Sequence, residues 1–184
     1  YLPAAKTYGD WLAKALSGPI RLDPSAFRRA EIDRVFRNNR EHPPMAKYAM
    51  GIGHLLGHRL LGVEANRACR WGVMALVALL LMAMFDFARR YFGLWAAVGA
   101  VLMLLGMPRF FFHAHLETLD APIAAGCFLS VWAYQRSLTS KRWIWMAAVC
   151  FGVALGTKLN APFVLVGCVL HLFWWQRSHL YVSR

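Results

Sequence analysis

The chain has 184 residues, of which 59% are hydrophobic and only 16% are charged. A soluble domain carries about 25% charged residues, so this composition argues against a soluble globular protein and predicts a membrane protein. The formal net charge of +12 would also suit a nucleic-acid partner. We exclude nucleic acid because the basic residues lie in one loop and in the flanks of apolar runs and form no nucleic-acid motif; lipid headgroups or a phosphate-bearing substrate explain the sign of the charge better.

The first 70 residues form a polar segment that holds twelve of the twenty-one Lys and Arg residues. The pattern predicts short amphipathic helices over residues 8–16 and 26–38, separated by turn-forming residues. We therefore expect residues 1–70 to be an extracytoplasmic loop with interfacial helices. Because the chain starts at Tyr1 and has no earlier span, we interpret it as an internal piece of a longer polytopic protein.

A further helix is predicted to begin at Pro44, because Pro43-Pro44 interrupts the preceding helix and proline suits a first helical turn. Lys47, His54 and His58 fall on one face of this helix. We interpret that face as wet and interfacial, since two histidines with no third ligand make a poor metal site. The opposite face is apolar at helical spacing and contains Met45, Tyr48, Ala49, Ile52, Leu55, Leu56 and Leu60.

Five apolar runs follow, with tryptophans near several of their ends, as in the aromatic belts of membrane proteins. Most are slightly shorter than the ~20 residues that span a bilayer, but flanking arginines can extend their stems to the interface. Buried helices of a soluble protein are the alternative, and they would need a polar shell that this chain lacks. We predict an all-α, polytopic membrane protein whose transmembrane region, 71–184, holds about five helices: 71–88, 91–108, 119–135, 143–157 and 159–176.

The basic residues between the runs predict the orientation of the chain. Seven lie after the first, third and fifth runs, and two lie in the alternate connections. The positive-inside rule then places 89–90, 136–142 and the C-terminus in the cytoplasm. Residues 1–70, residues 108–120 and the turn at Lys158 lie outside, so the candidate chemical groups share the external face.

Several polar groups on that face have more than one interpretation. Asp120 stands where a carboxylate would cap a helix start, or it serves a site. Lys158 either neutralises the end of the preceding helix or holds a phosphate. His113, His115 and Glu117 alternate, which would align them as metal ligands in an extended segment, but not if the connection is helical.

Three motifs together resemble a known superfamily. Glu41-His42-Pro43-Pro44-Met45-Ala46-Lys47 is similar to its "E-H-P-P-L-x-K" signature, residues 115–122 resemble a second loop in which "T-L-D-x-P" opens a helix, and Gly152–Lys158 resembles its "G-x-x-x-G-T-K" turn. The superfamily is that of the polytopic C-type glycosyltransferases, which includes protein O-mannosyltransferases and aminoarabinose transferases. The resemblance covers residues 1–175, with the motifs in the same order.

The resemblance implies a membrane glycosyltransferase that moves a sugar from a polyprenyl-phosphate donor to a protein or lipid acceptor, at the extracytoplasmic face of a bacterial plasma membrane. The family's Asp-Glu pair, whose Asp is taken as the base, is expected just before Tyr1, so this fragment alone should be inactive. Transferred onto the matching positions, the resemblance implies catalytic roles for Asp120 and Glu41, substrate binding by His42, Lys47, Lys158 and His115, and a possible divalent metal on Glu41 and His42.

A transporter or an assembly subunit, with no enzymatic activity, is the alternative. Transporters place charges near the bilayer midplane and often contain inverted repeats. Here the apolar runs have uncharged centres, the polar groups gather toward one surface, and no internal repeat is evident. These features favour a reaction at the membrane surface over a pathway through the membrane.

Overall fold

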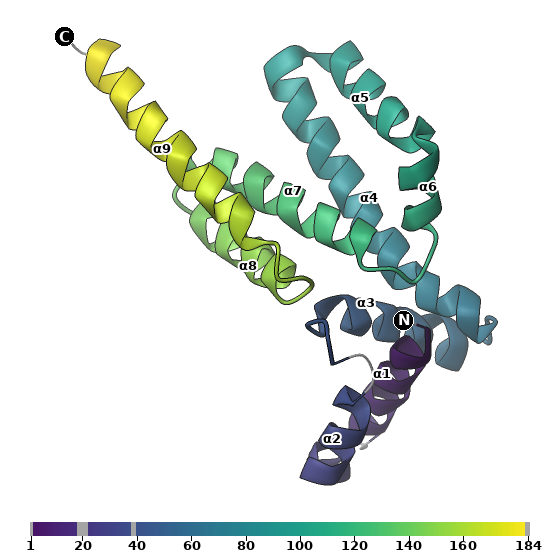
Figure 1. Cartoon of the computed structure of the whole chain (residues 1–184). Helices are drawn as coiled ribbons and strands as arrows, with labels where there is room; N and C mark the ends of the chain where they lie inside the picture. The colour runs from purple at the N-terminus through teal and green to yellow at the C-terminus, as the bar shows by residue number, and fades with distance from the viewer. Residues whose placement is uncertain (1, 18–21, 38–39, 183–184) are drawn as a thin grey trace.

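The computed structural model describes residues 2–17, 22–37 and 40–182, with side chains as far as residue 174. All regular structure in these residues is helical, which confirms the predicted all-α class. Figure 1 shows α1–α3 below the point where α4–α6 and α7–α9 diverge. The elements are α1 (Leu2–Ala15), η1 (Pro24–Phe27), α2 (Arg29–Phe36), α3 (Met45–His54), η2 (Leu55–Leu60), α4 (Ala65–Phe92), α5 (Leu94–Gly106), α6 (Pro108–Ala114), α7 (Asp120–Ser137), α8 (Trp143–Leu155) and α9 (Pro162–Val182).

An aromatic cluster holds α1, α2 and α3 together. Tyr8 of α1 lies with its ring centroid 5.3 Å from Phe36 of α2 and 5.1 Å from Tyr48 of α3. Trp11 joins the same cluster and donates its indole N–H to the carbonyl of Ala26 at 2.9 Å. Offset and edge-on aromatic pairs stabilise such contacts beyond the area they bury. The predicted amphipathic helices of the first segment therefore form one packed unit.

The predicted wet face of α3 is wrong for two of its three residues. Lys47 is 2% exposed and His54 is 3% exposed, because α1 packs on this face. The close approach depends on Gly9, since a Cβ there would lie 2.5 Å from Nδ1 of His54. His58 alone remains exposed, with Nδ1 2.8 Å from the carbonyl oxygen of Val63. The apolar face predicted for α3 is the more exposed one.

Acidification is expected to weaken the packing of α1 on α3 through His54. Burial lowers the pKa of His54; Asp10, 4.0 Å away, opposes this shift, while His58, Arg59 and Lys6 add to it. A histidine whose folded pKa is depressed takes up a proton on unfolding. Its contribution to stability is therefore present above the unfolded pKa of about 6.5 and is lost below it, by at most about 1.4 kcal/mol per pH unit.

The measurement is the thermal unfolding midpoint of the detergent-solubilised protein at about pH 7.5 and about pH 5.5. The midpoint of the wild type should fall on acidification, and the fall should be smaller in His54→Gln. An equal fall in both proteins would show that His54 does not carry the pH dependence.

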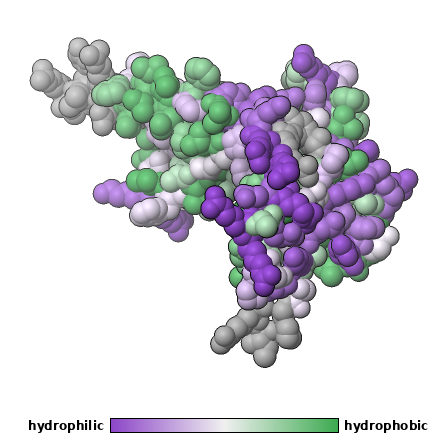
Figure 2. Space-filling view, turned by 60° about the horizontal axis from the view of Figure 1, so that its bottom comes forward, coloured by the Kyte–Doolittle hydropathy of each residue, from purple (hydrophilic) through white to green (hydrophobic). Residues whose placement is uncertain are grey.

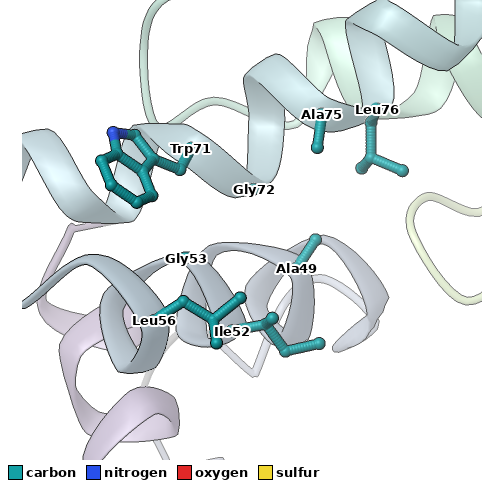
Figure 3. A pocket seen from close by; sticks show the side chains of 8 residues that line it. All are labelled: Ala49, Ile52, Gly53, Leu56, Trp71, Gly72, Ala75 and Leu76. Atoms are coloured by element: carbon teal, nitrogen blue, oxygen red, sulfur yellow. The ribbon is translucent and has the colours of Figure 1, made fainter. Parts of the chain in front are cut away.

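Glycines also let α3 cross α4 at short range. A Cβ on Gly53 would lie 2.6 Å from the carbonyl oxygen of Ala68, and one on Gly72 would clash with the backbone of Ala49. The glycines at this crossing thus permit the close packing of α3 on α4. Beside the crossing lies an apolar pocket of about 380 Å³ (Figure 3), lined by Ala49, Ile52, Gly53, Leu56, Trp71, Gly72, Ala75 and Leu76.

The helices α4–α9 differ in detail from the predicted spans. Among the described residues α4 alone is long and apolar enough to cross a membrane, and α5 with α6 would make a second span if the pair, bent by 77°, counts as one. α8 and the described apolar part of α9 are shorter apolar helices. Figure 2 shows a largely hydrophilic surface over α1–α3, which come forward in this view, and hydrophobic residues toward the C-terminal helix α9. The five predicted spans stay a prediction.

A polar cluster joins α4, α7 and α8 at the end of α7 that lies away from Asp120. Asp86 of α4 accepts hydrogen bonds from Arg90 at 2.9 Å, from the indole of Trp132 at 2.8 Å and from Arg136 at 2.7 Å. The guanidinium carbon of Arg136 lies 4.1 Å from the ring centroid of Trp143, a cation–π distance. The cluster holds the C-terminal end of α7 against α4 and against the start of α8.

Candidate functional site

Asp120 is the first residue of α7, and buried neighbours on both sides hold its backbone in place. Leu119 and Ala121 are each 2% exposed and belong to the core where α1, α3, α4, α6 and α7 meet. The side chain of Asp120, in contrast, is 58% exposed. It lies in the first turn of α7, so the predicted position at a helix start is confirmed, and its charge meets the positive end of the helix dipole. Because the side chain is exposed, this position leaves its oxygens accessible to other groups.

Lys158 supplies the cation that this carboxylate faces. Its Nζ donates to Oδ1 of Asp120 at 3.1 Å, across 38 residues of sequence. Lys158 follows the end of α8 in a turn in which the backbone N–H of Lys158 reaches the carbonyl of Ala154 at 3.1 Å. The hydroxyl of Thr157, itself 2% exposed, donates to the carbonyl of Val153 at 2.8 Å. The glycine-threonine-lysine turn thus presents the ammonium to the start of α7.

The Glu-His-Pro-Pro segment docks on the same turn. The backbone N–H of Met45 donates to the carbonyl of Gly156 at 2.8 Å. The side chain of Met45 packs against Gly156 so closely that a Cβ there would lie 2.5 Å from Cγ of Met45. The ammonium of Lys47 donates to the carbonyl of His42 at 2.8 Å and closes the turn around Pro43 and Pro44. Three motifs that lie far apart in the sequence therefore meet at one place.

A pocket of about 320 Å³ opens beside this junction, and the residues around it come from the first segment and the α8–α9 turn. Tyr8 forms part of the wall, and burial raises its pKa to about 12, so the phenol stays neutral. Burial likewise lowers the pKa of Lys47, as expected when an ammonium is desolvated. The pocket is lined by Tyr8, Phe36, Arg40, Glu41, His42, Pro43, Pro44, Lys47 and Leu159.

The predicted metal ligands Glu41 and His42 line this pocket, but no third metal ligand joins them among the described residues. No group of three His, Cys, Asp or Glu side chains among the described residues could hold a metal ion. A set of two protein ligands falls short of the three or four that transition-metal sites use. The described residues thus form no three-ligand metal site, and the divalent metal on Glu41 and His42 stays a prediction.

The alternating residues between α5 and α7 do not align as ligands. His113 lies in the helix α6, whereas His115 and Glu117 follow it. Nδ1 of His115 lies 2.8 Å from the carbonyl oxygen of Phe111, and Glu117 accepts from Arg70 of α4 at 3.0 Å. The extended arrangement that a metal cluster requires is absent from this part of the structure. The substrate-binding role of His115 stays a prediction.

Two residues near the site were not singled out as site residues from the sequence. Nδ1 of His113 lies 3.8 Å from Oδ2 of Asp120, and Tyr8 lies in the pocket wall. The alternation of His113 with its neighbours drew attention to it for a different reason, that of metal binding. Tyr8 carried only the signal of an aromatic residue in an amphipathic helix, which usually indicates core packing.

Comparison with known proteins agrees with the motifs. The sequence model of the dolichyl-phosphate-mannose-protein mannosyltransferase family matches residues 41–183. The chain belongs to this family. Comparison with curated proteins gives no match, and neither does comparison with solved structures.

Membership of the mannosyltransferase family confirms the resemblance inferred from the motifs, because the match begins at Glu41 and contains all three of them. Members of this family are membrane proteins and glycosyltransferases of the mannosyltransferase type. The chain is therefore assigned to that class of transferase. Asp120, Lys158 and most residues of the pocket wall lie within the matched region, whereas Tyr8, Phe36 and Arg40 of the wall precede it.

Proposed function

We propose that this protein transfers a sugar from a polyprenyl-phosphate donor to a protein or lipid acceptor at the extracytoplasmic face of a bacterial plasma membrane. The observation that carries the proposal is the meeting of three motifs: Lys158 pairs with Asp120 at 3.1 Å, while Met45 binds Gly156 through its backbone at 2.8 Å. The bias of basic residues toward the opposite connections supports the extracytoplasmic face.

Lys158 is proposed to bind the phosphate of the donor. Its side chain is 35% exposed and already sits on an anionic oxygen. An ammonium that pairs with a carboxylate can exchange it for the phosphodiester of the donor, which is also an anion with two charged acceptor oxygens, and the charge on this phosphate grows when the bond to the sugar breaks. Lys47, buried in the pocket wall, would add a second positive charge deeper in the site. The two cations would hold a dianionic leaving group between them.

Asp120 is proposed to act at the reacting centre, together with Glu41, which lines the pocket. Both are carboxylates, and carboxylates accept a proton from an attacking hydroxyl when they lie within hydrogen-bond reach of it. Glu41 is exposed and lines the pocket next to His42, which we propose contacts the donor. His115, on the loop before α7, would contact the donor from the Asp120 side.

The reaction is a direct displacement. The acceptor oxygen attacks the anomeric carbon of the sugar and forms the new glycosidic bond. The bond between that carbon and the phosphate oxygen breaks, and polyprenyl phosphate leaves with the electron pair. The hydroxyl proton passes to a carboxylate. Negative charge on the leaving phosphate grows in the transition state, so cations placed beside it lower the barrier.

The test uses full-length protein in reconstituted vesicles with radiolabelled polyprenyl-phosphate sugars, mannose first. Labelled acceptor and free polyprenyl phosphate should appear in equal amounts. Vesicles without the protein are the control. Absence of transfer with every donor, together with protein-dependent movement of a solute across the vesicle membrane, would overturn the proposal in favour of a transporter.

A further inference from the structure

We propose that His113 is a positioning residue for Asp120, a role that deepens the proposed function and rests on it. The two oxygens of the Asp120 carboxylate face two different nitrogens. Oδ1 lies 3.1 Å from Nζ of Lys158, and Oδ2 lies 3.8 Å from Nδ1 of His113. The carboxylate is thus held between an ammonium from the α8–α9 turn and an imidazole from the last turn of α6.

Nδ1 of His113 is buried and has no hydrogen-bond partner in the part of the chain that the structure describes. A buried polar atom without a partner costs free energy, so such atoms call for an explanation. Oδ2 of Asp120 is an acceptor 3.8 Å away, less than one ångström beyond hydrogen-bond range. The exposed Asp120 side chain can close that gap by rotating, whereas Nδ1 of His113 is buried and has no access to water as a hydrogen-bond partner.

The backbone that carries His113 is fixed from two sides. The carbonyl of His113 lies 3.5 Å from the hydroxyl of Thr118, which ties the end of α6 to the loop that follows. Glu117 in the same loop is bound by Arg70 of α4 at 3.0 Å, and its side chain is 11% exposed. Because this loop leads directly into Asp120, the spacing between His113 and Asp120 is set by anchored backbone.

The contact between His113 and Asp120 becomes important when the donor binds. Lys158 cannot pair fully with both Asp120 and the donor phosphate, so the phosphate would draw the ammonium away from the carboxylate. Asp120 would then lose its partner at the moment when its orientation matters most. An N–H on Nδ1 of His113 would then donate a hydrogen bond to Oδ2 of Asp120 and keep the carboxylate directed at the reacting centre. His113 acts on Asp120 and touches no reacting atom.

The experiment compares two amide replacements in the full-length transferase. In His113→Asn the side-chain amide stands where Nδ1 stood, whereas in His113→Gln it extends toward the position of Nε2. Loss of the bond to a charged group should lower kcat by about tenfold in His113→Gln. His113→Asn should restore most of the activity. The KM for the donor should change little in either variant, because Lys158 is intact.

His58→Gln is the matched control, since His58 is an exposed histidine whose Nδ1 already lies 2.8 Å from the carbonyl oxygen of Val63. Equal kcat values for His113→Asn, His113→Gln and the wild type would overturn the inference while leaving sugar transfer standing. Equal losses in Asn and Gln would also overturn it, because they would indicate packing alone.

A second measurement does not depend on transfer and covers the case in which the wild type shows none. Thermal midpoints are measured for His113→Gln, Asp120→Ala and the double variant. Residues that interact give non-additive changes. The inference predicts that the double variant loses less than the sum of the single losses. Additive losses would show that the two side chains do not act on each other.

Discussion

Asp120→Asn in the full-length protein is expected to lower the kcat of sugar transfer by about 10²- to 10⁴-fold, the range for loss of a group that handles a proton in the transition state. Asparagine keeps the shape of the side chain and an oxygen for Lys158, but it carries no charge and accepts no proton. The loss should fall on kcat, because the proposed contact of the donor phosphate is with Lys158.

The fold should survive this substitution. The side chain of Asp120 is exposed, and the buried residues Leu119 and Ala121 hold the backbone on either side of it. Asp33→Asn is the matched control, since Asp33 lies on the exposed face of α2, 4.0 Å from Arg29. A kcat for Asp120→Asn within twofold of the wild type, with a normal thermal midpoint, would refute the catalytic role.

Lys158→Ala is expected to raise the KM for the polyprenyl-phosphate sugar by about tenfold to a hundredfold, because a hydrogen bond to a charged group contributes about 1.5–3 kcal/mol. Lys158→Arg keeps the charge and should lose less. Some loss of kcat should accompany the alanine variant, since the charge on the leaving phosphate grows as the bond breaks. Initial rates over a range of donor concentrations separate the two effects.

Lys141→Ala is the control for the removal of a cation. Lys141 is exposed in the connection between α7 and α8, at the end of α7 away from Asp120. It should leave the KM for the donor unchanged. An unchanged KM in Lys158→Ala would contradict the phosphate-binding role and leave Lys47, in the pocket wall, as the cation to examine next.

The helices were largely predictable because each depends on residues close in sequence. The predicted helix 119–135 is observed as Asp120–Ser137, and the predicted 143–157 as Trp143–Leu155. The predicted 91–108 is observed as Leu94–Gly106, but the helix α6 that follows it was not predicted. The chain breaks near Pro108 and bends by 77° into α6, because proline both starts a helix well and disfavours helical geometry in the residue before it.

The faces of α3 were less predictable for a different reason. Helical periodicity separates a polar face from an apolar one, but it does not say which element packs on which face. Here α1 covers Lys47 and His54, so the face with charged residues is buried and Ile52 on the other face is 48% exposed. Small residues such as Gly9 allowed this packing, and their effect depends on a partner about 45 residues away in sequence.

The sequence alone determined the all-helical class, the transferase family and the three motifs, because composition, periodicity and short signatures are properties of local sequence. Only the tertiary structure decided that Asp120 pairs with Lys158, that Met45 docks on Gly156 and that His113 faces Asp120. Side-chain partners separated by tens of residues meet only when helices pack, and packing depends on the shapes of whole faces.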